Sequence, residues 1–323
     1  MKIKMRIAFA LFFMAVNCQG QKYPNAEISN ALITAKILLP EEGKGYYQGT
    51  RFDWSGVISD LEYNGHSFFG VWNPKFEPGL HDAITGPVEE FTVIGYEEAE
   101  VGETFLKIGV GELEKPEESA YSKFKTYQIK NHGKRKVKVR ENKIQFTQIL
   151  KMSNGYSYNY VKKMTLKNSS LILSHSLKNT GNKTINTSVY NHNFFIIDKE
   201  PTNANIKTSF VFDVKPEGTI KGFGTTAKIE EQSIIYNRAI AKLENVFSNE
   251  LTGFGSTSKD YDIRIENLKT KAGVRITSDQ PINNMVFWAC ATTSCPEPYT
   301  KVDVEPGETF TWDINYAFLS DLP

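Results

Sequence analysis

Residues 143–195 read KIQFTQILKMSNGYSYNYVKKMTLKNSSLILSHSLKNTGNKTINTSVYNHNFF. Apolar and polar side chains alternate in short segments, as they do in strands that bury one face. Asn154-Gly155, Asn168-Ser169 and residues 179–183 provide the residue types that turns favour between these segments. The stretch therefore predicts a meander of antiparallel strands.

The C-terminal part continues this pattern. Four further alternating segments are divided by Gly, Pro and Asp: YDIRIEN (261–267), GVRITS (273–278), MVFWAC (285–290) and FTWDINYAF (310–318). Only residues 228–249 have a possible helical period, and we expect at most a short element there. Because no Pro/Ser-rich linker divides residues 21–323, we predict one all-β domain, a large antiparallel β-sandwich without βαβ alternation.

The composition narrows the classes of partner. The chain has 323 residues, with 38 Lys and Arg against 37 Asp and Glu. This balance provides no electrostatic footprint for nucleic acid or an acidic membrane surface. The 15 Tyr and 21 Phe residues suit strands, and they also suit a site that stacks on flat ligand faces.

Residues 1–20 have the pattern of a secretory signal peptide. MKIKMR carries positive charges, IAFALFFMAV is an apolar run too short to be a permanent membrane span, and NCQG follows. Cleavage near Gly20 would leave Gln21 first. Lipidation of Cys18 is an alternative, although Asn17 is not the small residue expected before a lipidated cysteine. We expect an exported protein of the periplasm or envelope, with no membrane span and a possible lipid anchor at Cys18.

Cys290 and Cys295 are the cysteines that remain after removal of the signal. An oxidising compartment permits a disulfide between them. Two separate small core residues fit the sequence as well. The sequence leaves open whether they pair.

Histidines are few, and one has unusual neighbours. His66 is in a turn, His132 is in a basic loop, and His175 is interpreted as an outward polar position of a strand. His192 lies between two asparagines inside the apolar stretch VYNHNFFII (189–197). Polar residues in such a stretch are costly when buried without partners, so they either line a cleft or form a bonded core group.

Glu297 is the second candidate, because it stands between Pro296 and Pro298. Prolines restrict their own backbone and that of the preceding residue, which would hold the carboxylate in position. A carboxylate held beside aromatic residues is a candidate general base. The alternative is an exposed loop acid without a role.

Three motifs in order resemble the galactose mutarotase-like (aldose 1-epimerase) superfamily. They are NHNFF (191–195), FWAC with the following CPEPY (287–290 and 295–299), and VEPGETFTW with YAF (304–312 and 316–318). The resemblance implies a β-supersandwich that binds a sugar ring in a groove and interconverts its α and β anomers. It also implies His192 as general acid and Glu297 as general base, with their tips about one sugar ring apart. One acid and one base suffice for this chemistry, so we expect no metal or other cofactor.

The N-terminal half departs from that family. Its Asn-Arg-Ile and His-Gly-Gly segments are missing, and YYQGTRFDWSG (46–56) and GLHDAITGPVEEF (79–91) stand in their place. Arg51 and His81 are the best substitutes. Arg51 could bond sugar hydroxyls or a uronate carboxylate, or it could be part of a structural ion pair. Further candidates for the groove are Asp53, Trp54, Asp82, Glu89, Glu90, Asn191 and Asn193.

Three functions remain open at this point. The first is an exported mutarotase-like isomerase that acts on a free sugar or uronic acid. The second is a carbohydrate-binding protein without activity, and the third is a polysaccharide-processing enzyme such as a lyase. Fold analogy alone does not choose among them.

Overall fold

Strands make up almost all of the regular structure. The computed structural model describes residues 23–73 and 75–322. Within these ranges the helices are two short 3-10 turns, η1 (Ile197–Lys199) and η2 (Ser258–Asp260). The prediction of an all-β fold is confirmed. The signal segment 1–20 and Cys18 lie outside the described residues, and the described part contains no helix long and apolar enough to span a bilayer.

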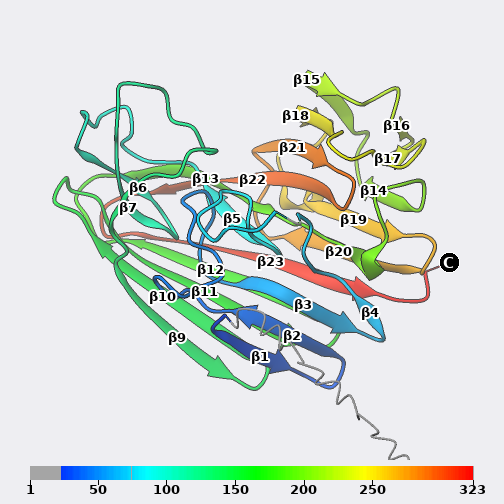
Figure 1. Cartoon of the computed structure of the whole chain (residues 1–323), viewed down its shortest axis with the longest axis horizontal. Coiled ribbons are helices and arrows are strands. Elements are labelled where there is room, and N and C mark those ends of the chain that lie inside the picture. The colour runs from blue at the N-terminus through cyan, green and yellow to red at the C-terminus, as the bar shows by residue number, and fades with distance from the viewer. Residues whose placement is uncertain (1–22, 74, 323) are drawn as a thin grey trace, which may run out of the picture.

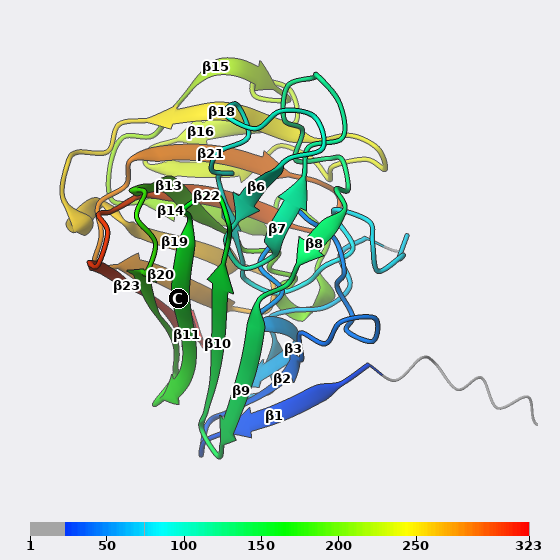
Figure 2. The same ribbon diagram turned by 90° about the vertical axis from the view of Figure 1, so that its left-hand side faces the viewer.

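The largest sheet is antiparallel and has ten strands. In spatial order they are β16 (Ala227–Glu230), β17 (Ser233–Tyr236), β14 (Ile206–Phe210), β19 (Asp262–Asn267), β20 (Ala272–Ser278), β23 (Thr309–Leu319), β12 (Ser170–Asn179), β11 (Ser157–Lys167), β10 (Lys143–Lys151) and β9 (Lys134–Arg140). Figure 1 shows this sheet crossing the length of the molecule, and Figure 2 shows the curvature of β9, β10 and β11.

Three smaller sheets accompany the large one. The six-stranded sheet has the order β15 (Lys215–Lys221), β18 (Val246–Thr252), β21 (Asn284–Ala289), β22 (Ser294–Val304), β13 (Ile185–His192) and β5 (Val88–Phe91). The four-stranded sheet consists of β1 (Asn25–Ser29), β2 (Ile33–Leu38), β3 (Val57–Tyr63) and β4 (His66–Ser67). The three-stranded sheet consists of β6 (Thr104–Lys107), β7 (Gly111–Glu114) and β8 (Ile129–Asn131).

The predicted meander is present for three of its four strands. β10, β11 and β12 pair antiparallel in chain order, with Asn154-Gly155 and Asn168-Ser169 between them. The prediction is wrong for the fourth strand, because β13 crosses to the six-stranded sheet and pairs with β22 and β5. Its last four residues are all buried, which requires a layer on each face rather than one solvated face.

The main core includes side chains from the large sheet and from the sheets that cover it. One hydrophobic cluster contains residues from Ile28 in β1 to Phe318 in β23. The alternation of β12 places His175 on the same face as Leu173 and Leu177, so its ring points inward and stacks on Trp312 at 4.4 Å. The interpretation of His175 as an outward position is therefore wrong, since residues two apart share a face.

The structure also bears on the possible helical segment and on the two cysteines. Residues 228–249 contain the β16–β17 hairpin and the start of β18, so the possible helical period does not produce a helix. Cys290 and Cys295 are free thiols; Cys290 is partly exposed and Cys295 is buried. The two cysteines therefore follow the alternative of separate residues.

Candidate active site

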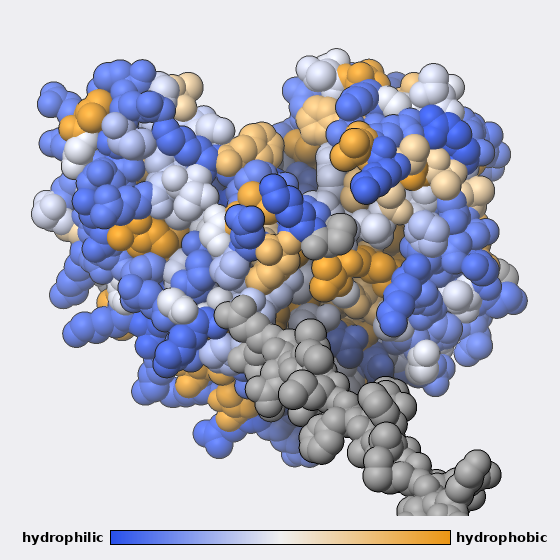
Figure 3. All heavy atoms as spheres, viewed as in Figure 1, coloured by the Kyte–Doolittle hydropathy of each residue, from blue (hydrophilic) through white to orange (hydrophobic). Residues whose placement is uncertain are grey.

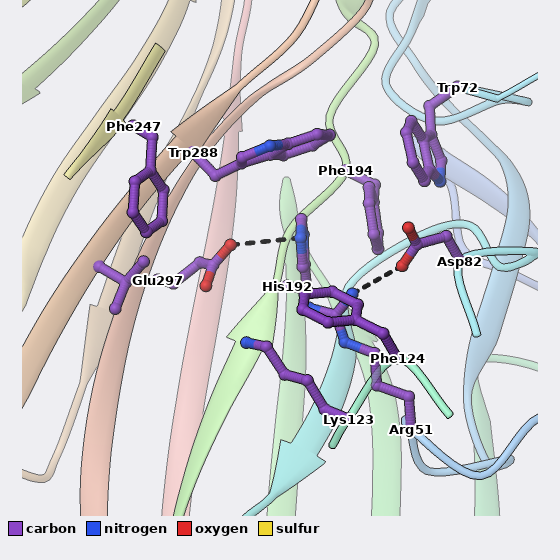
Figure 4. A pocket seen from close by; sticks show the side chains of 11 residues that line it. Arg51, Trp72, Asp82, Lys123, Phe124, His192, Phe194, Phe247, Trp288 and Glu297 are labelled. Atoms are coloured by element: carbon purple, nitrogen blue, oxygen red, sulfur yellow. Dashed lines mark hydrogen bonds and ion pairs between the residues drawn. The ribbon is translucent and has the colours of Figure 1, made fainter. Parts of the chain in front are cut away.

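A cavity of about 280 Å³ lies between the loop that joins β7 to β8 and the six-stranded sheet. Figure 3 shows the surface hollowed between the part of the chain that carries β6 and β7 and the part that carries β15 and β18. The cavity is largely aromatic. Its walls are Arg51, Trp72, Asp82, Lys123, Phe124, His192, Phe194, Phe247, Val286, Trp288 and Glu297 (Figure 4).

Two neighbouring strands bring His192 and Glu297 together. β13 and β22 pair antiparallel as far as Tyr190 opposite Tyr299. Beyond that pair Glu297 lies inside β22, buried and only 3% exposed, so the alternative of an exposed loop acid is wrong. Proline can stand here because the β13 ladder has ended, and the side chain of Asn193 donates to the carbonyl of Pro296 at 3.2 Å.

The two side chains touch directly. Nε2 of His192 lies 3.2 Å from Oε1 of Glu297. The imidazole is stacked on Phe194 at 3.7 Å between ring centroids, and its Nδ1 has no hydrogen-bond partner among the described residues. The expected separation by the width of a sugar ring is therefore wrong for this structure. Buried polar groups pair with each other when no other partner is in reach.

Burial moves the pKa values of the pair in opposite directions. Burial lowers the pKa of His192 well below its usual value, and the charges of Arg51 and Lys123 act in the same direction. Burial raises the pKa of Glu297 to about 7, against the opposing effect of Lys123 and Arg51. The charged form of each group is disfavoured, so below about pH 7 the pair holds a single acidic proton on Glu297.

Arg51 lines the cavity and also belongs to a structural ion cluster. Its Nη1 lies 2.6 Å from Oδ1 of Asp82, and its Nε lies 2.7 Å from Oε2 of Glu90. Its Nη2 donates to the hydroxyl of Tyr190 at 3.1 Å. The interpretation of Arg51 as part of a structural ion pair is therefore confirmed, and the protein engages all three of its nitrogens, while a bond from Arg51 to a sugar stays a prediction.

His81 and Glu90 lie near the cavity without lining it. Nε2 of His81 is 3.0 Å from Oδ2 of Asp82, which does line the cavity. Glu90 lines a second cavity of about 270 Å³, together with Thr92, Val93, Lys107, Tyr121, Lys123, Tyr190 and Tyr299. Lys123 lines both cavities.

Five other predicted site residues lie away from the cavity. Glu89 and Asn191 are linked by a hydrogen bond of 3.0 Å inside a buried ionic cluster, and Asp53 donates its backbone N–H to the carbonyl of Glu89. Trp54 donates its indole N–H to the carbonyl of Gly49. Asn193 holds the backbone of β22, as described above. None of the five lines the cavity, and all five are buried among other residues, so the structure does not place them in the groove.

Sequence reasoning missed most of the cavity wall. Trp72 comes from a loop, Phe247 from β18, and Val286 and Trp288 from β21. Lys123 and Phe124 stand in the β7–β8 loop without a recognisable motif. The aromatic composition favours a site that stacks on flat ligand faces, but it does not indicate which aromatic residues line that site. The described part of the chain contains no group of three or more His, Cys, Asp or Glu side chains placed to hold a metal ion.

Comparison with solved structures identifies the fold. A candidate aldose 1-epimerase from Escherichia coli K12 matches 92% of this chain and 99% of its own, with a TM-score of 0.56 and 12% identity. The chain has the galactose mutarotase-like fold. A galactose mutarotase related enzyme from Lactobacillus acidophilus matches 93% of this chain and 98% of its own, with a TM-score of 0.52 and 13% identity.

A homologue of aldose epimerase from C. elegans matches 93% of this chain and 99% of its own, with a TM-score of 0.51 and 13% identity. The mutarotase-like fold therefore extends over the N-terminal half of the chain, beyond the motifs of residues 190–318. No family model matches the chain. No curated protein matches it.

Proposed function

We propose that the protein is an exported isomerase of the aldose 1-epimerase type, which binds one sugar ring and interconverts its anomers. The observation that carries the proposal is the contact of 3.2 Å between His192 and Glu297 in the wall of a largely aromatic cavity. A cavity with apolar faces and a few convergent polar groups is the usual form of a small-ligand site.

The pair has the composition that anomer exchange requires. A hemiacetal opens when the anomeric hydroxyl loses its proton and the ring oxygen gains one. The C1–O5 bond then breaks, the aldehyde rotates, and closure on the other face reverses both proton transfers. A ligand that enters between His192 and Glu297 would replace their mutual contact with one contact to each oxygen.

The direction of the two proton transfers follows from burial. With Glu297 protonated and His192 neutral, Glu297 donates to the ring oxygen and His192 accepts from the anomeric hydroxyl. The family resemblance assigns the two roles in reverse. Both assignments describe the same pair with one proton, and each residue takes the other role when the ring closes again.

Anomer exchange can be measured on the wild type and on Glu297→Gln. Polarimetry or exchange NMR with a panel of hexoses and uronates should show catalysed exchange in the wild type. Glu297→Gln should lower the rate by about 10²–10⁴-fold with little change in affinity, because Gln keeps the shape and loses the proton. Glu308→Gln is the matched control, since Glu308 is exposed in a turn before β23. Equal rates in Glu297→Gln and the control would sink the assignment.

The second candidate is a carbohydrate-binding protein without catalysis. The aromatic wall by itself favours it, because Trp72, Phe194 and Trp288 can stack on a sugar ring whether or not the acid–base pair reacts. Binding of sugars without any anomer exchange would support this candidate. Release of an unsaturated uronate from a polysaccharide would instead indicate a lyase.

Export remains part of the proposal and rests on residues 1–20 alone. We expect the mature chain to begin near Gln21, or at a lipidated Cys18. Intact-mass measurement of the protein from its native envelope fraction distinguishes the two forms. A mass that includes Met1 would contradict export.

A further inference from the structure

We propose that the ligand of this cavity is a sugar with an anionic substituent, and that Lys123 binds the anion. The substituent is a carboxylate or a phosphate on a carbon away from the anomeric centre. This inference rests on the proposed function for the sugar ring but not on catalysis.

Lys123 occupies a distinctive position in the loop between β7 and β8. It lines the cavity that holds His192 and Glu297, and it also lines the neighbouring cavity beside Tyr190 and Tyr299. Figure 4 shows its side chain extending toward Glu297 from the side of Arg51. An anion at its ammonium group would therefore lie at the junction of the two cavities, while the ring lies beside His192.

The other two cations of the junction have protein counter-ions. Arg51 pairs with Asp82 and Glu90, and Nζ of Lys107 lies 3.6 Å from Oε1 of Glu90. Within residues 23–73 and 75–322 no carboxylate forms an ion pair with Lys123. Its ammonium instead lies 5.7 Å from the ring centre of Phe124 and 5.8 Å from that of Tyr190.

The local charges do not cancel without a ligand. Arg51, Lys107 and Lys123 face the two carboxylates of Asp82 and Glu90. Glu297 is the remaining acid of the first cavity, and burial raises its pKa to about 7, so the neutral carboxyl predominates below that pH. Below that pH one positive charge is left in a partly buried place, where Coulomb interactions are stronger than in bulk water. A ligand anion would compensate it.

A different role for Lys123 makes a different prediction. Its charge opposes the rise of the pKa of Glu297, so it could act only by tuning that carboxyl. A tuning residue would affect neutral and acidic sugars alike. A residue that binds the ligand's anion affects the acidic sugars selectively.

Titration calorimetry on matched sugar pairs tests the proposal. D-galacturonate against D-galactose probes the carboxylate, and D-glucose 6-phosphate against D-glucose probes the phosphate. We expect the wild type to bind at least one acidic sugar about tenfold or more tightly than its neutral partner, as charged hydrogen bonds allow. Lys123→Met should abolish this preference, and Lys123→Arg should retain part of it. Lys125→Met is the loop control, because Lys125 pairs with Glu117 and lines neither cavity.

The salt dependence of wild-type binding keeps the test independent of any folding defect in the variants. Added NaCl should weaken binding of the acidic sugar and leave the neutral sugar unchanged. Equal wild-type affinity for both members of each pair would overturn the proposal. An equal loss for acidic and neutral sugars in Lys123→Met would also overturn it.

Anomer exchange on the same sugars separates this inference from the proposed isomerase. Selective binding of acidic sugars without exchange would support the role of Lys123 and sink the isomerase. Exchange of neutral sugars without any preference for acidic ones would sink the role of Lys123 and leave the isomerase.

Discussion

His192 and Glu297 combine deep burial with mutual contact, and this combination decides their protonation. Each is about 3% exposed, and His192 is packed against the faces or edges of Phe194 and Trp288. Removal from water disfavours both the imidazolium and the carboxylate. In the proposed isomerase the pair would therefore act through the one proton that it shares, and its two pKa values belong to the pair as a unit.

The pH dependence of anomer exchange should follow that proton. The pKa of Glu297 is raised to about 7, so its carboxyl keeps the proton below that pH and loses it above. We expect kcat/KM to fall as the pH rises through about 7. On the acid side the rate should fall only below the usual pKa of histidine, because the pKa of His192 is lowered. Rates that stay level from acidic to alkaline pH would contradict this assignment.

At the scale of elements, β5 joins the two main sheets through a buried ionic cluster. Glu89 in β5 forms an ion pair with Lys162 in β11, and its Oε1 lies 2.9 Å from Nε2 of His175 in β12. Burial alone would raise the pKa of Glu89, but Lys162 and His175 lower it to about 2. The stability that this carboxylate provides is present above its usual pKa and is lost as the pH falls toward 2.

Breaking this cluster should destabilise the fold. Lys162→Met would leave Glu89 buried without its main counter-charge, and we expect a loss of about 3–5 kcal/mol in the free energy of unfolding. Lys163→Met is the matched control, since Lys163 is exposed on the opposite face of β11. Urea denaturation near neutral pH measures both variants. Equal midpoints for the two would show that the cluster contributes no net stability.

At the scale of the whole molecule, the cavity exists because distant parts of the chain meet. Phe124 comes from the β7–β8 loop, Phe247 from β18 and Trp288 from β21. Of the four tryptophans in the chain, Trp72 and Trp288 line the cavity. Trp54 and Trp312 are buried in the core and line no part of this cavity.

Ligand binding should therefore change the fluorescence of two tryptophans. A bound sugar that stacks on Trp72 or Trp288 replaces water beside the indole and should shift its emission. We expect this response to be lost when both are replaced by Phe and to persist in Trp54→Phe. A wild-type response that survives the double replacement would place the ligand outside this cavity.

The sequence by itself determined three strands of the meander, the turns between them and two residues that line the cavity. Alternation and turn residues are local, so they located β10, β11 and β12 before any tertiary contact was known. His192 and Glu297 were detectable because each is a polar residue in a local setting that disfavours it. The order of the motifs from residue 190 onward pointed to the fold that the structural comparisons show.

Only the tertiary structure decided which strands pair and what each acid contacts. Glu89 and Glu90 are adjacent, yet they point to opposite faces of β5, one into the cluster with Lys162 and one toward Arg51. Lys123 has no local pattern at all, and its position at two cavities depends on how its loop packs against β13. Strand order and cavity walls come from contacts between residues far apart in the chain, which periodicity does not encode.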